Sequence, residues 1–253
     1  MVKSVLITGC NRGIGLEFVR QFLTDNSPPE HVIATCRNPE NAKDLNTLRK
    51  EHPGRLHILQ LDVTHWTEYA NLVKLVEDIV GVDKGLTLLI NNAAILPELE
   101  ELGDIDIECM LEAYKVNCVA PIILSKHFLP LLKKSSKNYN DETMSIHKSA
   151  IVYISSDWAS IKERETSEHG SFYPYRCSKS ALNMGMKNLS IDLEKDRILV
   201  TSIYPGWVQT DMGGPNGELT VEDSVSSMMK MMSNMTETNH GTFVQFDGAP
   251  MPW

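Results

Sequence analysis

The sequence predicts an α/β protein: a doubly wound parallel sheet with helices on both faces. Short apolar runs, typical of strands buried on both faces, alternate along the chain with stretches of helical periodicity. The connections between them are short, and a glycine-rich segment separates the first strand from the first helix. Because we find neither an internal repeat nor a linker, we expect residues 1–253 to form a single domain.

The composition narrows the classes of partner. The chain has 253 residues, 42% of them hydrophobic, which is enough for a full core. Its net charge of -9 does not favour nucleic acid or an anionic membrane, and no apolar run is long enough to span one. The five cysteines form no C-x-x-C pair, so we expect free thiols and no metal site. With no signal segment at its start, the chain is expected to be cytoplasmic.

In the first half of the chain the elements follow one another regularly. Breaks such as His52-Pro53-Gly54 separate them. Strands are predicted at 5–7, 31–36, 56–61 and 86–90, and helices at 14–23, 39–51 and 66–80.

The second half contains the longest helical stretch, 107–132. Pro121 lies inside it and Pro130 near its end, so we expect an irregularity near 117–121. Residues 133–148 are polar and are predicted to be a surface insertion. Strands are predicted at 150–154, 198–203 and 242–246, and helices at 175–193 and 221–233.

The segment between the first strand and the first helix has the residues of a phosphate-binding turn. Gly9, Gly13 and Gly15 can adopt positive φ and let a pyrophosphate approach backbone N–H groups at the start of a helix. Their spacing, G-x-x-x-G-x-G, differs from the G-x-G-x-x-G of the general dinucleotide fingerprint. A glycine-rich turn without a ligand is the alternative interpretation.

Polar residues follow most of the predicted strands. Ligands of open parallel sheets bind at the carboxyl ends of the strands, so these residues are expected to share one edge. They are Arg37, Asp62, Asn91, Ser156 and the segment 205–210.

A tyrosine and a lysine on the predicted helix 175–193 suggest acid/base chemistry. Tyr175 and Lys179 are four residues apart and so lie on one helical face. A nearby ammonium favours the phenolate, so we expect Lys179 to lower the pKa of Tyr175 and make it a proton donor near neutral pH. The Ser156 hydroxyl could hold a substrate carbonyl oxygen.

Together these features resemble the short-chain dehydrogenase/reductase family over essentially the whole chain. Within it, the runs ITGCNRGIGL and YPGWVQTDMGG look most like the Sniffer-type carbonyl reductases and the related C-factor proteins. The resemblance implies a Rossmann-type sheet of seven strands in the order 3-2-1-4-5-6-7. It rests on TGCNRGIG (8–15), NNAA (91–94), Asn117, Ser156, the Tyr175–Lys179 pair and PGWVQT (205–210).

The family pattern also implies roles for individual residues. Tyr175 would be the acid/base, Lys179 would tune it and bind the ribose, Ser156 would orient the carbonyl, and Asn117 would hold a relay water. Asp62 would bind near the adenine, and Val208 and Thr210 near the carboxamide. The full set of cofactor-binding residues would be Gly9, Asn11, Arg12, Gly13, Ile14, Gly15, Arg37, Asp62, Val63, Asn91, Ala93, Tyr175, Lys179, Pro205, Gly206, Val208 and Thr210.

The expected cofactor is NADPH/NADP+. A carboxylate at the end of the second strand would repel a 2′-phosphate, and that position is Cys36. Arg37 follows it and Arg12 lies in the glycine turn, so two guanidiniums could clamp the phosphate. In the alternative interpretation, both arginines are merely solvated.

The expected function is reduction of a small carbonyl compound by NADPH, with Tyr175 as proton donor. The alternatives are an NADP(+)-dependent alcohol or hydroxysteroid dehydrogenase, and a cofactor-binding sensor with incidental turnover. Helices 107–132 and 175–193 are expected to pair in a homodimer. Tyr173, Trp158, Trp207 and Met212 suggest an apolar, quinone-like pocket.

Two features depart from the family pattern. Ala94 replaces the usual glycine of NNAG, which could shift the turn after the fourth strand. Ser156 and Tyr175 lie 19 positions apart, so residues 161–171 are expected to add a loop over the substrate site.

Overall fold

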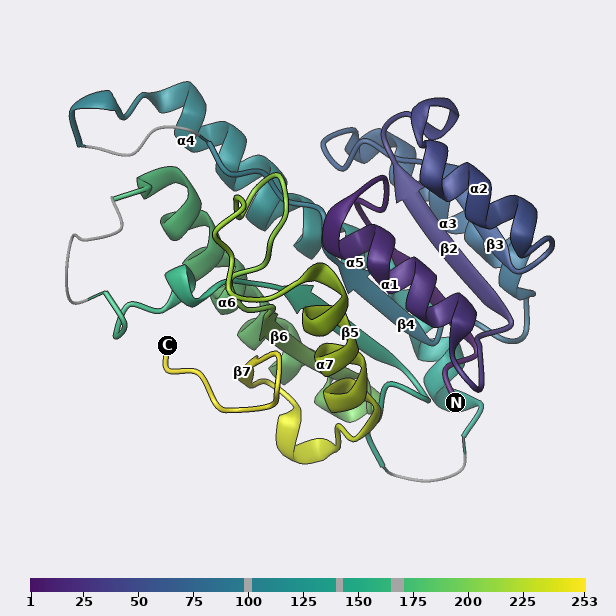
Figure 1. Cartoon of the computed structure of the whole chain (residues 1–253). Coiled ribbons are helices and arrows are strands. Elements are labelled where there is room, and N and C mark those ends of the chain that lie inside the picture. Colours follow the sequence, from purple (N-terminus) through teal and green to yellow (C-terminus); the bar gives the residue numbers. More distant parts are fainter. Residues whose placement is uncertain (98–101, 140–142, 165–170) are drawn as a thin grey trace.

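The computed structural model describes residues 1–97, 102–139, 143–164 and 171–253. In this part of the chain, seven strands form one parallel sheet in the order β3-β2-β1-β4-β5-β6-β7, which confirms the predicted fold class and order (Figure 1). The strands are β1 (Ser4–Ile7), β2 (His31–Cys36), β3 (Leu56–Gln60), β4 (Leu88–Asn91), β5 (Ala150–Ile154), β6 (Leu199–Tyr204) and β7 (Phe243–Gln245).

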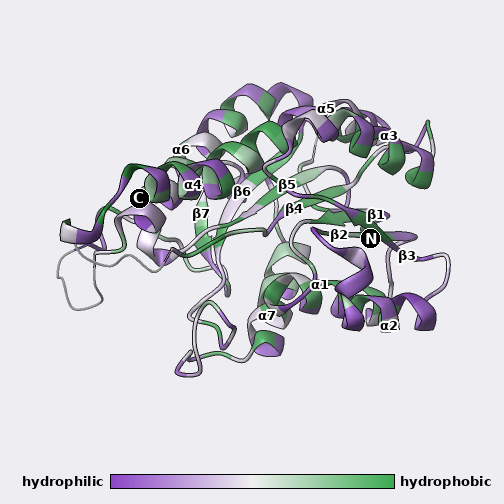
Figure 2. Ribbon diagram, turned by 90° about the horizontal axis from the view of Figure 1, so that it is seen from above, coloured by the Kyte–Doolittle hydropathy of each residue, from purple (hydrophilic) through white to green (hydrophobic). Residues whose placement is uncertain are grey.

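Helices cover both faces of the sheet. Figure 2 shows α1, α2 and α7 on one side, and α3, α4, α5 and α6 on the other. The helices are α1 (Gly13–Thr24), α2 (Lys43–Glu51), α3 (Tyr69–Val80), α4 (Ile107–Tyr114), α5 (Ala120–Lys137), α6 (Tyr173–Leu193) and α7 (Val221–Ser233).

The two layers explain why the central strands are continuous apolar runs. Val5 and Ile7 of β1 belong to the core cluster beneath α1 and α7, and Leu6 between them belongs to the cluster beneath α3, α5 and α6. Alternate residues of β5 divide in the same way. Because side chains alternate between faces, a strand buried on both sides needs apolar residues at every position.

The predicted irregularity near residues 117–121 is confirmed. A π-helical segment, Lys115–Val119, separates α4 from α5. At its end, the N–H of Ala120 bonds to the carbonyl oxygen of Lys115, five residues back. Pro121 lacks an N–H and cannot donate to the carbonyl oxygen of Asn117, so the regular α-helical pattern is interrupted at this point.

The prediction that residues 133–148 form a surface insertion is wrong for the residues described. Helix α5 continues through Pro130 to Lys137, and Ser135, Ser136 and Lys148 are buried. The Ser135 hydroxyl donates to the carbonyl oxygen of Lys148 at 2.6 Å, and that of Ser136 to the carbonyl oxygen of Asp196 at 2.8 Å. Serines paired in this way can be buried despite their polarity. Residues 140–142 lie outside the described residues.

Candidate active site

The carboxyl ends of the strands bring the predicted polar residues to one edge of the sheet. Asn91 ends β4, Ser156 follows β5, and Pro205 follows β6. The glycine turn follows β1, which lies beside β4 at the point where the strand order reverses. In Figure 1 the yellow-green segment between β6 and α7 lies beside the purple start of α1. This is the edge at which doubly wound sheets bind their ligands.

The glycine turn packs too closely against the chain after β4 to accept side chains at two positions. A Cβ on Gly9 would lie 3.0 Å from the Cα of Ala93, and one on Gly15 would lie 2.6 Å from Nδ2 of Asn92. Gly9 and Gly13 have positive φ angles of 72° and 56°. Gly13 faces only Thr210, whose Cγ2 would be 3.5 Å from its Cβ. The side of the turn at Gly9 and Gly15 is therefore closed by the chain after β4, and the side at Gly13 is open.

Asn92 supports this turn, a role that sequence reasoning missed. Its Nδ2 donates to the carbonyl oxygens of Thr8 at 2.8 Å and Gly9 at 3.2 Å. The Thr8 hydroxyl oxygen accepts from the N–H groups of Asn92 and Ala93, both at 3.0 Å. An amide directly after a strand that ends at the predicted edge was the available signal. Asn11 is exposed within the turn, and Ile14 packs against the core.

The two arginines predicted to hold a phosphate lie near the turn in different settings. Arg12 forms an ion pair with Asp211 at 3.1 Å, and both side chains are largely exposed. This pair links the turn to the segment after β6, and Asp211 was not predicted. Arg37 directly follows β2 and is exposed, while Cys36 is buried. Strand β2 therefore ends without a carboxylate, as the sequence indicated.

Asp62 and Val63 follow β3 in a fixed turn. The Oδ1 atom of Asp62 accepts from the N–H and the hydroxyl of Thr64 at 2.9 and 2.7 Å. Burial alone would raise the pKa of Asp62, but these hydrogen bonds hold it below its usual value. The carbonyl oxygen of Val63 accepts from the hydroxyl of Tyr69. This turn is therefore held rigidly at the edge.

The segment after β6 is anchored on two sides. Ser224 of α7 donates to the carbonyl oxygen of Pro205 at 2.6 Å, and Val208 is buried and pairs with Leu219. A Cβ on Gly206 would lie 2.5 Å from the side chain of Leu219, and the Thr210 hydroxyl accepts from the N–H of Gly213 at 2.9 Å. The predicted residues of this segment therefore have fixed positions.

Asn91 is buried in a polar cluster. Its Nδ2 donates to Oγ of Ser125 at 3.1 Å, and Tyr153 also donates to this oxygen, at 2.7 Å. The Oδ1 atom of Asn91 is buried and has no hydrogen-bond partner within the described residues. Asn91 thus retains an unused acceptor near the sheet edge.

Ser156, Tyr175 and Lys179 come together as predicted. Their side chains are 8%, 9% and 2% exposed. The Ser156 side chain lies close enough to the Tyr175 hydroxyl to act on its pKa. The Nζ atom of Lys179 lies 5.7 Å from the centre of the Tyr175 ring and donates to the carbonyl oxygen of Ile154 at 2.8 Å.

The predicted lowering of the Tyr175 pKa is wrong. Burial raises this pKa to about 12, while the Ser156 side chain acts in the opposite direction. Burial also lowers the pKa of Lys179 to about 8. Desolvation disfavours the charged form of each side chain. Tyr175 is consequently protonated at neutral pH, and Lys179 is still mostly cationic.

Asn117 lies in the π-helical segment, and its side chain is already occupied. Its Oδ1 accepts from the N–H of Ile95 at 2.8 Å, and its Nδ2 donates to the carbonyl oxygen of Ile95 at 2.9 Å and to Ser178 at 3.1 Å. The side chain thereby ties the chain after β4 to α6. The backbone carbonyl oxygen of Asn117 receives no α-helical hydrogen bond from position 121, because Pro121 has no N–H.

Sequence reasoning missed two residues beside Ser156. Asp157 accepts a hydrogen bond from Oγ of Ser156 at 3.0 Å and interacts with the Tyr204 side chain. Burial, followed by the charge of Asp157, raises the pKa of Tyr204. The available signal was a carboxylate directly after the predicted catalytic serine.

Aromatic side chains line this region only in part as predicted. The ring centre of Trp158 lies 4.7 Å from that of Phe172, with the rings tilted, and 6.0 Å from that of Tyr175, with the rings edge to face. The guanidinium carbon of Arg176 lies 4.3 Å from the centre of the Trp158 ring. Trp207 and two other predicted pocket residues, Tyr173 and Met212, are partly exposed. Of the predicted loop 161–171, residues 165–170 lie outside the described residues.

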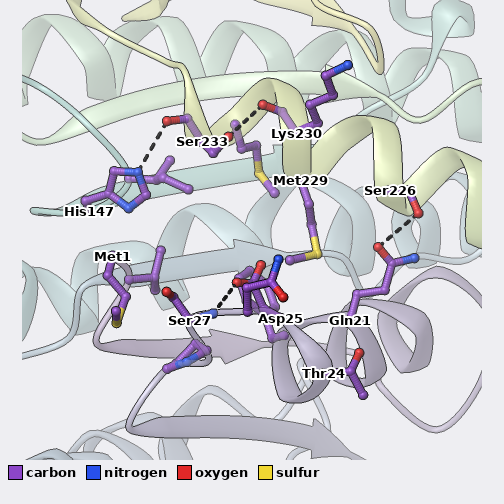
Figure 3. Close-up of a pocket in the computed structure, with 16 residues that line it drawn as sticks. Met1, Gln21, Thr24, Asp25, Ser27, His147, Ser226, Met229, Lys230 and Ser233 are labelled. Atoms are coloured by element: carbon purple, nitrogen blue, oxygen red, sulfur yellow. Dashed lines mark hydrogen bonds between the residues drawn. The ribbon is translucent and has the colours of Figure 1, made fainter.

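A groove of ≈ 500 Å³ lies away from this edge (Figure 3). Gln21 and Asp25 from the α1 region face Met229 and Lys230 of α7 across it. None of the residues predicted for the active site lines this groove.

Comparisons with known proteins agree with this geometry. The family model described as short chain dehydrogenase matches residues 3–219. The structure is similar to the carbonyl reductase Sniffer of D. melanogaster, with 41% identity, a TM-score of 0.96 and full coverage of both chains. It is also similar to the NADPH-bound carbonyl reductase from chicken fatty liver, with 40% identity, a TM-score of 0.95, and coverage of 100% of this chain and 94% of that one.

A further relative is named for a signal and not for a reductase. The C-signal protein of Myxococcus xanthus is 31% identical over 166 residues, which cover 66% of this chain and 92% of that protein. The match of the family model over most of the chain, together with the geometry at the sheet edge, shows that this protein belongs to the short chain dehydrogenase family of oxidoreductases.

Proposed function

We propose that this protein is an NADPH-dependent carbonyl reductase that converts a ketone, aldehyde or quinone to the alcohol. The observation that carries the proposal is the juxtaposition of the Ser156 side chain and the Tyr175 hydroxyl, with Lys179 one helical turn further along α6. The similar chicken enzyme, a carbonyl reductase described as NADPH-bound, supports the choice of cofactor.

The residues at the sheet edge fit a dinucleotide. The open side of the glycine turn, at Gly13, lets a pyrophosphate approach the backbone N–H groups at the start of α1. Arg12 and Arg37 would hold a 2′-phosphate by charge-assisted hydrogen bonds, with Arg12 exchanging its partner Asp211 for the phosphate. The other predicted contacts would come from Asn11, Asp62, Val63, Asn91, Ala93, Pro205, Gly206, Val208 and Thr210.

When bound, NADPH supplies a hydride, whose electron pair forms the new C–H bond at the carbonyl carbon. Tyr175 then gives its phenolic proton to the oxygen that receives the carbonyl π electrons, and its phenolate recovers a proton from water. The ammonium of Lys179 stabilises this phenolate and binds the ribose. Ser156 positions the carbonyl oxygen, and the backbone of Asn117 holds the relay water.

Tyr175 is in the protonation state that carbonyl reduction requires at neutral pH. A phenol whose pKa is raised to about 12 is ready to donate a proton at neutral pH, whereas alcohol oxidation requires the phenolate. An NADP(+)-dependent alcohol or hydroxysteroid dehydrogenase is therefore the second candidate. The third candidate is a signalling protein whose turnover is incidental, and the name of the C-signal relative supports it.

A substrate panel tests the proposal. The purified protein is mixed with NADPH or NADH and with representative aldehydes, ketones and quinones, and loss of the reduced nicotinamide absorbance is followed. We expect turnover of at least one class, faster with NADPH. Tight NADPH binding without turnover of any compound would favour the signalling role.

We also propose a cytoplasmic homodimer. Ile107 and Leu111 of α4 and Met184 and Ile191 of α6 are exposed apolar residues, which a second copy of the chain could cover. Sedimentation at micromolar concentration is expected to show twice the mass of 28.4 kDa, and a monomer would contradict this. No helix in the described part of the chain is long and apolar enough to cross a membrane.

A further inference from the structure

The hydrogen of the Ser156 hydroxyl is already used within the protein. The hydroxyl donates to Oδ1 of Asp157 at 3.0 Å and accepts from the N–H of Trp158 at 3.1 Å. A hydroxyl offers one hydrogen and two acceptor positions, and an ionised carboxylate can only accept. A substrate carbonyl oxygen, which also only accepts, therefore competes with Asp157 for the single hydrogen of Ser156.

Asp157 is held in this position by several elements. It begins the short 3-10 turn Asp157–Ala159, in which the Ser156 side chain caps the N–H of Trp158. The Asp157 carboxylate also interacts with the Tyr204 side chain at the end of β6. From α6, the positive charge of Arg176 acts on it. A carboxylate has about four acceptor positions, so these neighbours leave room for another donor.

This arrangement creates a conflict for an ordinary ketone. Its oxygen must draw the hydrogen of Ser156 away from Asp157, which leaves a carboxylate oxygen without that donor. A hydrogen bond to a charged group is roughly twice as strong as one between neutral groups, so its loss weakens the binding of such a ketone. A substrate that brought its own donor to Asp157 would avoid it.

We propose that Asp157 is a specificity-determining residue that selects carbonyl substrates with a hydrogen-bond donor on the neighbouring carbon, such as α-hydroxyketones. This inference rests on the proposed carbonyl reductase function. The substrate hydroxyl takes the place of Ser156 at Asp157, and Ser156 turns its hydrogen to the carbonyl oxygen. Two oxygens on adjacent carbons are close enough to meet Ser156 and Asp157, which lie 3.0 Å apart, at the same time.

Two matched ketones test the proposal. 2-Hydroxyacetophenone carries the donor, and 2-methoxyacetophenone has the same ring and carbonyl but an ether in its place. For the wild type we expect kcat/KM to be about tenfold or more higher with the hydroxyketone, the effect of one hydrogen bond to a charged group. The ratio should fall in D157N, which keeps an acceptor without the charge, and approach one in D157L.

The absolute rates and a control variant separate selection from structural damage. In D157L the released Ser156 hydroxyl should raise kcat/KM for the methoxyketone, whereas general damage would lower it for both ketones. The charge of Glu218, like that of Asp157, raises the pKa of Tyr204, but the hydrogen bonds of the Ser156 side chain in the described part of the chain are to Asp157 and Trp158, so E218Q should leave the ratio unchanged.

The outcomes distinguish this inference from the function on which it rests. Equal kcat/KM for the two ketones in the wild type would overturn the role of Asp157 and leave the reductase function intact. A ratio that persists in both D157N and D157L would do the same. Failure of the wild type to reduce either ketone or any member of the wider panel would overturn the function, and the inference with it.

Discussion

Replacing Gly15 with alanine should damage the glycine turn through a single methyl group. The new Cβ would lie 2.6 Å from Nδ2 of Asn92 and collide with the carbonyl oxygen of Gly9. Gly15 has no positive φ, so the effect comes from contact alone. Overpacking costs about 1–3 kcal/mol, and the displaced Asn92 amide loses hydrogen bonds that contribute about 1 kcal/mol each. The better helix propensity of alanine returns about 1 kcal/mol.

The expected net loss is about 2–3 kcal/mol of unfolding free energy, which lowers Tm by roughly 5–10 °C in a chain of this size. NADPH affinity should fall as well, because the backbone that meets the pyrophosphate moves. Thermal unfolding and a fluorescence titration with NADPH measure the two effects. Gly103→Ala is the matched control, since no atom of the described part of the chain lies within 4 Å of its Cβ position. Wild-type Tm and affinity for Gly15→Ala would refute the close packing of this turn.

Two further predictions concern charged residues at the site. Arg37→Ala should weaken NADPH binding far more than NADH binding, because the arginine is expected to contact the 2′-phosphate; equal loss in parallel titrations would remove this assignment. Because the pKa of Lys179 is lowered to about 8, its ammonium is present below that pH and lost above it, so reduction should decline as the pH rises through 8. Lys179→Met should be slower and lack this decline in a pH–rate profile, and an unchanged profile would show that another group titrates.

The residues that could be predicted from sequence are those whose signal is local. The apolar runs of β1, β4 and β5 indicated burial on both faces, and the alternation of strands with helices indicated a parallel sheet. Tyr175 and Lys179 could be paired because the spacing of four residues on a helix brings them to one face. The break before α5 followed from Pro121 in the same way.

The features that were missed depend on contacts between distant segments. The Arg12–Asp211 pair and the contact of Tyr204 with Asp157 exist only once β1, β5 and β6 are aligned. Ser135 and Ser136 were predicted to lie at the surface because they are polar. They are buried because their hydroxyls donate to backbone carbonyl oxygens of other segments. The pKa of Tyr175 was mispredicted because the desolvation of a side chain cannot be read from its neighbours in sequence.

The most direct test of the central claim is the rate of NADPH oxidation by Tyr175→Phe across the carbonyl panel. Phenylalanine keeps the ring that packs against Trp158 and removes only the hydroxyl that donates the proton. We expect the fold and NADPH affinity to be retained and the rate to fall by ~10²–10⁴-fold, as for loss of a positioned general acid. Wild-type rates in this variant would contradict the assignment of Tyr175 as the proton donor.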